Sequence, residues 1–208
     1  MEVREENRFI IRGSIVGKEE SAKRCSLTIA TSGGFDRKTF PKIFFYDRKL
    51  VDHFNISDRV LIRGIIHNHF VINPDTGKKD YQSTPIGQQI YRSSRLLHDY
   101  YPFDVIKDPD GGAPDDKNEV MMAGKVTMVY KPEQNKNLVL IKVRCDEQGK
   151  SGFGQFSCFS KCADIASTCK PGDFVIAAGY INTDLKEKNG GRKVYQSIIC
   201  RDIYKVED

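Results

Sequence analysis

The 208-residue sequence predicts an all-β chain made of two small barrels in tandem. Three observations predict this fold class. Apolar segments rich in β-branched and aromatic residues recur along the chain and are separated by turn residues. A polar segment rich in Pro, Gly and Asp, YYPFDVIKDPDGGAPDDK, interrupts the chain near residues 100–118. The segments before this break recur in the same order after it, which indicates one structural unit used twice.

Each half reads as three strands, a short helix and two further strands. This element order is that of the OB-fold, a five-stranded Greek-key barrel with its helix between strands 3 and 4. We therefore expect a first domain at 1–103, a linker at 104–117 and a second domain at 118–208. The expected strands are 7–16, 25–31, 40–46, 59–66 and 88–97 in the first half, and 118–126, 137–145, 153–159, 174–181 and 194–204 in the second.

The expected helices and bends come from residue spacing. Leu50, Val51 and Phe54 fall on one helical face in the first half, and Cys162, Ile165, Ala166 and Cys169 do so in the second. Each opening strand carries a Gly six residues after an Asn, because Asn7 precedes Gly13 and Asn118 precedes Gly124. A Gly inside a strand predicts a bulge or sharp bend, which small barrels require.

Composition excludes several classes. No apolar run approaches the ~18 residues that span a bilayer, and the charged start MEVREENR does not resemble a secretion signal. We therefore expect a cytoplasmic, non-membrane protein. The six cysteines include no Cys-x-x-Cys pair, so reduced, buried thiols are expected rather than disulfides. We expect no bound metal. The alternatives are a zinc ion on Cys158, Cys162 and Cys169, or a metal ion on His67 and His69.

Catalysis is not expected either. The sequence has no Walker loop, H-E-x-x-H, G-x-S-x-G or G-x-G-x-x-G motif, so neither an enzyme nor a cofactor is predicted. The net charge of +5 lies wholly in the first half: residues 1–107 hold 18 Lys and Arg against 13 Asp and Glu, and residues 108–208 hold 15 of each. The first half is therefore expected to attract a polyanion more strongly.

The third expected strand of the first half, FPKIFFY, carries the most informative pattern. Because strand side chains alternate between faces, Ile43 and Phe45 can enter the core. The other face then holds Phe40, Lys42, Phe44 and Tyr46. Bases of an unpaired strand stack on such rings for about 1–3 kcal/mol each, and a cation between them meets the phosphates. The pattern therefore predicts binding of single-stranded nucleic acid without sequence preference.

These segments together resemble the bacterial single-stranded DNA-binding protein family. The opening NRFIIRGSIVG is similar to the family's first strand, and IATS with the following Phe35 is similar to its second. Phe40 to Tyr46 resembles the third strand, whose ends carry DNA-stacking aromatics. FSKCADIA, from Phe159, resembles the strand-to-helix junction. The resemblance implies sequence-independent binding and protection of single-stranded DNA in replication, recombination or repair.

The candidate DNA-binding residues follow from the pattern and the resemblance together. Phe35 and Phe70 are further stacking candidates, and Arg12, Lys42, Lys78 and Lys79 are phosphate candidates. In the second half, Phe153 and Phe159 stand where Phe40 and Tyr46 stand in the first, and Lys161, Arg192 and Lys193 are its cations. With fewer aromatics and no net charge, the second half is expected to bind more weakly and to extend the path or assist assembly.

The resemblance also bears on partners. Most members of the family carry one OB domain and form tetramers, so a chain with two implies a homodimer of four barrels. The sequence departs from the family in lacking Trp and in ending IYKVED, without the family's acidic tail and hydrophobic tip; recruitment of repair proteins by such a tail is not expected. The alternative function is an OB module that binds a protein partner or RNA in a replication or mobile-element complex.

Overall fold

The computed structural model describes residues 4–21, 24–33, 37–72, 79–93, 116–147, 150–188 and 191–206. Within these residues the first half comprises strands β1 (Glu6–Glu20), β2 (Cys25–Ser32), β3 (Lys38–Thr39), β4 (Lys42–Phe45), β5 (Arg59–Ile72) and β6 (Lys79–Arg92), with the 3-10 turn η1 (Arg48–Leu50). The second half comprises β7 (Lys117–Tyr130), β8 (Leu138–Glu147), β9 (Lys150–Phe159), helix α2 (Ser160–Thr168), β10 (Phe174–Lys188) and β11 (Gly191–Lys205).

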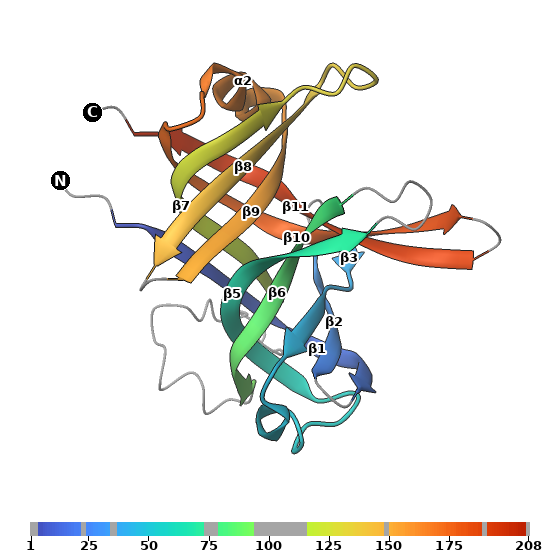
Figure 1. Cartoon of the computed structure of the whole chain (residues 1–208). Helices are drawn as coiled ribbons and strands as arrows, with labels where there is room; N and C mark the ends of the chain where they lie inside the picture. Colours follow the sequence, from blue (N-terminus) through green and yellow to red (C-terminus); the bar gives the residue numbers. More distant parts are fainter. Residues whose placement is uncertain are drawn as a thin grey trace, which may run out of the picture.

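The strands repeat one pairing scheme (Figure 1). In the second half β7, β8, β9, β11 and β10 pair in succession and β10 pairs back with β7, which closes a five-stranded barrel. In the first half β1, β2, β4, β6 and β5 pair in the corresponding succession and β5 pairs back with β1, while β4 meets β6 at the single parallel pair Phe44↔Ile86. The expected all-β class is confirmed.

The strands differ from expectation in length. Nearly all extend beyond the apolar segments that predicted them, because paired backbone continues into polar hairpin arms. The closing strand of the first half, expected at 88–97, begins earlier: β6 starts at Lys79, which pairs with Ile72, and ends at Arg92, and residues 94–97 lie outside the described residues. The expected linker lies mostly outside the described residues, and its last residue, Lys117, begins β7.

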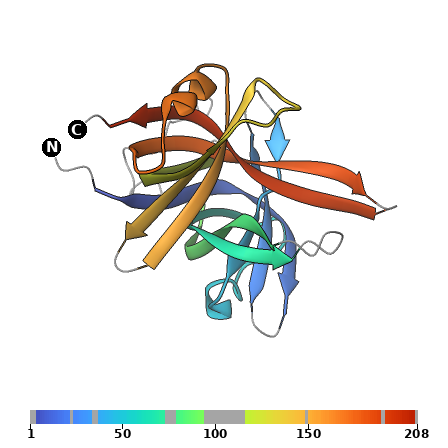
Figure 2. The ribbon, with the colours of Figure 1, turned by 45° about the horizontal axis from the view of Figure 1, so that its top comes forward.

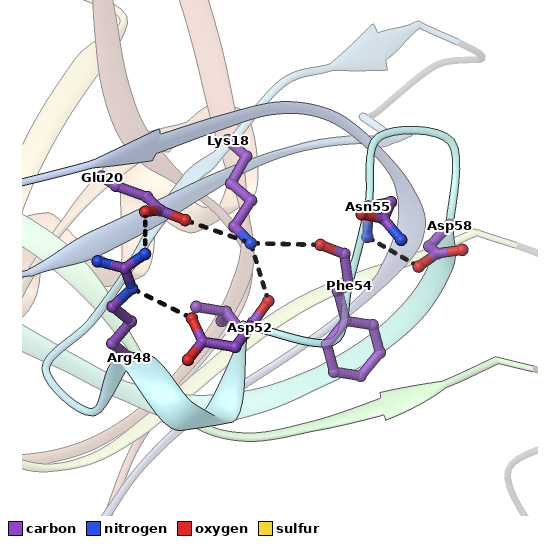
Figure 3. A network of polar contacts seen from close by, with 8 residues as sticks. Lys18, Glu20, Arg48, Asp52, Phe54, Asn55 and Asp58 are labelled. Carbon is purple, nitrogen blue, oxygen red and sulfur yellow. Dashed lines mark hydrogen bonds and ion pairs between the residues drawn. The ribbon is translucent and has the colours of Figure 1, made fainter.

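The expected helix of the first half is wrong. The segment forms only η1, and its turns are closed by bonds to the third residue back, from Val51 N–H to Arg48 O (2.9 Å) and from Phe54 N–H to Val51 O (3.1 Å). The Lys18 ammonium donates to the carbonyls of Val51 (3.2 Å) and Phe54 (3.4 Å) (Figure 3). In a longer helix these carbonyls would instead accept hydrogen bonds from backbone N–H groups. Arg48 is held by Glu20 (2.5 Å) and Asp52 (3.2 Å). Hydrogen bonds from Lys18, a residue distant in sequence, therefore take the place of helical bonds at these carbonyls.

The expected helix of the second half is confirmed. Helix α2 directly follows β9 and buries Ala163 and Ala166, while Cys162 and Ile165 pack against the core. Two alanines favour helix, whereas the corresponding segment of the first half contains Val51, His53 and Phe54, which are poorer helix formers. Figure 2 shows α2 lying over one end of the second-half strands. Among the described residues, no helix is both long and apolar enough to cross a membrane.

Glycines let neighbouring strands approach closely, and the register shifts of the two opening strands fall just after them, between Ile15 and Gly17 and between Val126 and Met128. A Cβ on Gly13 would lie 2.2 Å from the carbonyl oxygen of Ala30, and one on Gly124 would lie 2.0 Å from that of Arg144. Each Gly therefore admits the backbone of the second strand of its own half. Without this close approach, the opening strand could not curve from one neighbour to the next.

The two halves share one continuous sheet. β1 and β7 pair antiparallel from Glu6↔Ala123 to Arg12↔Lys117. Asn7 exchanges two hydrogen bonds with the backbone of Ile66 (2.8 and 2.9 Å), and Asn118 does the same with Ile181 (2.8 and 3.0 Å). Both asparagines are buried, and each ties the opening strand of its half to a later hairpin arm.

Candidate nucleic-acid interface

Strand β4 separates core and surface side chains by simple alternation. Ile43 and Phe45 are fully buried, whereas Phe40 and Tyr46, which flank the strand, are 45% and 67% exposed. Lys42 and Phe44 lie on the same face as the two flanking rings and are half-buried. The predicted arrangement of FPKIFFY is confirmed: one face holds the barrel together and the other presents rings to solvent.

Cations surround the central ring of this face. The Arg24 guanidinium lies 4.8 Å from the centre of the Phe44 ring, and Lys42 Nζ lies 5.8 Å from it. Lys42 also pairs with Glu19 at 2.5 Å. A cation over an aromatic face is held by the ring quadrupole, and both partners remain at the surface. The face therefore combines flat apolar rings with positive charge, which is the chemistry that an unpaired base and its phosphate require. Sequence reasoning did not single out Arg24, which precedes β2 and reaches Phe44 only across the sheet.

The second half presents a corresponding face on β8 and β9. In each half the third strand pairs in parallel with the closing strand, at Phe44↔Ile86 and at Ser157↔Ile199. Superposing the halves on these pairs places Phe153 at the position of Phe40 and Phe159 at that of Tyr46, as the sequence predicted. Phe159 is 40% exposed.

The cations of this second face lie on a different strand. Lys142 Nζ and the Arg144 guanidinium are each 5.8 Å from the centre of the Phe153 ring, and Phe153 is the cross-strand partner of Arg144. Sequence reasoning did not single out these two residues. The sequence did carry a signal for them in NLVLIKVRC. There Lys142 and Arg144 alternate with the buried Ile141 and Val143 and so lie on the opposite face of the strand. Their position beside Phe153 depends on the β8–β9 register.

The remaining candidates divide into placed and undescribed residues. Arg12 lies where β1 meets β7 and is only 8% exposed, so it does not join the ring-bearing surface. Lys161 is exposed at the start of α2, two residues after Phe159. Phe35 and Lys78 lie outside the described residues, and the backbone but not the side chain is described for Phe70, Lys79, Arg192 and Lys193.

A separate groove of about 780 Å³ lies over the joint of β1, β5 and β7. Its charges are largely matched, because Arg8 pairs with Glu6 at 2.9 Å and Lys117 with Glu119 at 3.4 Å. It does not include the rings of β4 or β9. The aromatic faces are therefore the stronger candidate site.

The cysteines behave as core residues. All six are free thiols; Cys162 is half-buried and the other five are buried. Burial raises the pKa of Cys162 to about 11 and also raises the pKa of Cys25 and Cys169. Among the described residues, no three His, Cys, Asp or Glu side chains are placed to hold a metal ion.

Comparison with solved structures identifies the fold. The wild-type single-stranded DNA binding protein from Thermus aquaticus matches with a TM-score of 0.62 at 12% identity, covering 99% of this chain and 95% of that one. A deletion mutant of the same protein matches with a TM-score of 0.61 at 12% identity, covering 99% and 97%.

A Plasmodium falciparum SSB in complex with ssDNA matches with a TM-score of 0.35 at 15% identity, covering 44% of this chain and 96% of that one. No family model and no curated protein matches the sequence. The two matches to the Thermus aquaticus protein show that the chain has the fold of that protein along almost its whole length.

Proposed function

We propose that this chain binds single-stranded DNA independently of sequence, by stacking bases on exposed rings and holding phosphates with nearby cations. The observation that carries the proposal is the face of β4, where Phe40 and Tyr46 are 45% and 67% exposed on either side of Lys42 and Phe44. Apolar side chains that gather on one face, rather than lie scattered singly, are the kind that mark a binding site. In replication, recombination or repair, such binding would protect unpaired strands; no catalytic step is proposed.

Sequence independence follows from the chemistry of the face. Every base has an aromatic face that stacks on Phe or Tyr, and every nucleotide has a phosphate that meets Lys or Arg. Reading a base would instead need side-chain donors and acceptors aimed at its edge. The rings of this face and the long flexible side chains of Lys42 and Arg24 are suited to the first mode of recognition.

We propose that each half is one OB-fold barrel, with residues 1–103 and 118–208 as the two domains and 104–117 as the linker. The repeated strand pairing and the full-length likeness to the Thermus aquaticus protein support this division. Domain one is proposed to bind first, and the face of Phe153 and Phe159 to extend the path. Phe35, Phe70, Lys78, Lys79, Lys161, Arg192 and Lys193 stay in the proposed set, and Arg12 is left out because it is buried.

Two copies are proposed to associate as a homodimer with four barrels. Ile10, Leu61 and Ile65 are partly buried apolar residues on adjoining strands β1 and β5. A second copy would cover such residues and leave β4 and β9 free for DNA. Light scattering coupled to gel filtration tests this directly: twice the mass of one chain supports a dimer, and the mass of one chain contradicts it.

The test of function is a fluorescence-anisotropy titration with labelled dT, duplex DNA and RNA oligonucleotides over a salt series. Tight, salt-sensitive binding of dT, much weaker binding of duplex, and a large loss in Phe40→Ala/Tyr46→Ala would support the proposal. Ser167→Ala, in α2 and outside the proposed stacking rings and cations, is a control that should bind like wild type.

The competing functions give different results in the same titration. Preference for RNA over dT would favour an RNA-binding module, which uses the same rings but adds contacts to the 2′-hydroxyl. Negligible dT binding at low salt would contradict the proposal and favour an OB module that binds protein.

A further inference from the structure

We infer that Thr183 and Gln196, both in the second half, position the DNA-stacking strand of the first half; this inference rests on the proposed function. The two residues are cross-strand partners on the β10–β11 hairpin. Figures 1 and 2 show this hairpin extending away from its own barrel and passing beside β3. The first half is therefore expected to need the second half for full affinity for DNA. The contacts between them are hydrogen bonds of uncharged groups.

The contacts fall on the backbone around Phe40. Thr183 Oγ1 accepts a hydrogen bond from Phe40 N–H (2.9 Å) and lies 2.9 Å from the Thr39 hydroxyl. The Gln196 carboxamide pairs with both backbone polar groups of one residue: its Oε1 accepts from Lys42 N–H, and its Nε2 donates to Lys42 O at 3.3 Å. One cross-strand pair therefore fixes both ends of the Phe40-Pro41-Lys42 segment.

These contacts fill a gap in the ladder of β4. On one side β4 pairs with β2 from Thr28↔Lys42 to Cys25↔Phe45. On the other side its described pairing with β6 is at Phe44↔Ile86 only, so the strand edge at Lys42 has no strand beside it. An edge of this kind leaves backbone donors and acceptors to solvent. The carboxamide of Gln196 has the same donor and acceptor as a peptide group and takes the place of the missing strand.

This edge matters because the rings depend on it. Phe40 and Phe44 precede and follow Lys42, whose backbone Gln196 holds, and they lie on the face that we propose meets the bases. A ring that is already held in place loses less conformational freedom when a base stacks on it. Thr183 and Gln196 are thus positioning residues for DNA binding.

The other half carries a weaker version of the same contact. Ser83, on the β5–β6 hairpin, accepts a hydrogen bond from Gln155 N–H on β9 at 3.2 Å. Gln155 occupies on β9 the place of Lys42 on β4, as the alignment of the third strands requires. Ser83 provides a single short hydroxyl where Gln196 provides a carboxamide with two bonds. Ser83→Ala is therefore the matched control.

The experiment measures dT affinity by anisotropy for Gln196→Ala, Thr183→Val, Thr183→Ser and Ser83→Ala. We expect Gln196→Ala and Thr183→Val to lose roughly two- to tenfold in affinity, the range of one or two neutral hydrogen bonds. Thr183→Ser keeps the hydroxyl and should bind like wild type, and Ser83→Ala should lose less than Gln196→Ala. The slope of log affinity against log salt should not change, because no charge is removed.

A double-mutant cycle separates positioning from general loss of structure. If Gln196 acts through Phe40, most of its effect should disappear in a Phe40→Ala background, and the two changes should be non-additive. Equal affinity of Gln196→Ala and wild type would overturn the inference, as would a loss that is fully additive with Phe40→Ala. Absence of dT binding by wild type would instead overturn the proposed function itself.

Discussion

Ser57 and Gly172 occupy corresponding turns immediately before β5 and β10, and both have left-handed backbone, with φ of 76° and 98°. Ser57 N–H donates to Ile15 O (2.8 Å), and Gly172 N–H donates to Val126 O (2.9 Å). The same turn therefore closes the same loop in both halves. The second half has Gly172 here, which tolerates this conformation, whereas the first half has Ser57, which is strained by it.

Ser57→Gly is therefore predicted to stabilise the chain. A non-Gly residue in the left-handed region costs about 1–2 kcal/mol, and the added freedom of Gly in the unfolded chain returns part of it. We expect the free energy of unfolding to rise by about 0.5–1 kcal/mol. The reverse change, Gly172→Ser, should lower the free energy of unfolding, because Ser is strained at this backbone conformation. A Cβ there meets nothing within 4 Å, so the strain is confined to the backbone. Urea unfolding measures both; a lower midpoint for Ser57→Gly would contradict this account.

Two carboxylates, Asp58 in the first half and Asp173 in the second, predict how stability depends on pH. A hydrogen bond from Asn55 N–H (2.9 Å), with help from Arg92, lowers the pKa of Asp58 below its ordinary value. Lys205, followed by Lys170 N–H, lowers the pKa of Asp173. A carboxyl with a lowered pKa in the folded state stabilises the fold above its unfolded pKa and loses that effect as pH falls through its folded pKa.

Stability should therefore be steady near neutral pH and fall below about pH 4, the ordinary value for Asp. In Asp58→Asn/Asp173→Asn we expect lower stability at neutral pH and a shallower fall on acidification. Urea unfolding at a series of pH values measures both effects. If wild type and the variant show parallel pH profiles, these two carboxylates are not the cause.

The local elements were predictable because neighbouring residues decide them. The alternation of FPKIFFY predicted the faces of β4, and Gly13 and Gly124 mark where the second strand of each half approaches closely. Helix α2 followed from the spacing of its buried residues. In these cases the signal lies within about ten residues, and the barrel core reinforces the local preference.

The unpredicted features depend on residues far apart in the sequence. Lys18 binds the carbonyls that would have served a helix after β4, and Gln196 binds the backbone of Lys42 across the two halves. Arg144 meets Phe153 only through the β8–β9 register. No periodic pattern encodes such contacts, because they depend on how the finished strands are placed.

The two aromatic faces should contribute unequally to DNA binding. Phe40→Ala/Tyr46→Ala removes the rings that flank Lys42 and Phe44, whereas Phe153→Ala/Phe159→Ala removes the corresponding rings of the second half. Each stacked ring contributes about 1–3 kcal/mol, and we expect the larger loss from the first pair because the net positive charge lies in the first half. Titration with dT at fixed salt compares them; a larger loss from the second pair would reverse the proposed order of binding.

The thiols should be unreactive in the folded chain. Burial raises the pKa of Cys162, the most exposed of them, to about 11, so it is protonated near neutral pH. We expect iodoacetamide to label the native protein slowly and to label all six cysteines in guanidinium chloride. Intact-mass spectrometry counts the labels. Rapid labelling of the native chain would show that these thiols are accessible and that the core opens readily.

The salt dependence of binding should show where the second half meets phosphates. Its cations lie on β8, beside Phe153, rather than between the rings of the third strand as Lys42 does. If Lys142 and Arg144 each neutralise one phosphate, replacing both with Gln should reduce the slope of log affinity against log salt by about 0.7 per lost contact. Lys170→Gln, in the turn after α2, removes one positive charge from a position outside the two faces and should leave the slope unchanged. Equal slopes for wild type and Lys142→Gln/Arg144→Gln would mean that DNA does not reach this face, and the second half would then act on DNA only through its hairpin contact with β4.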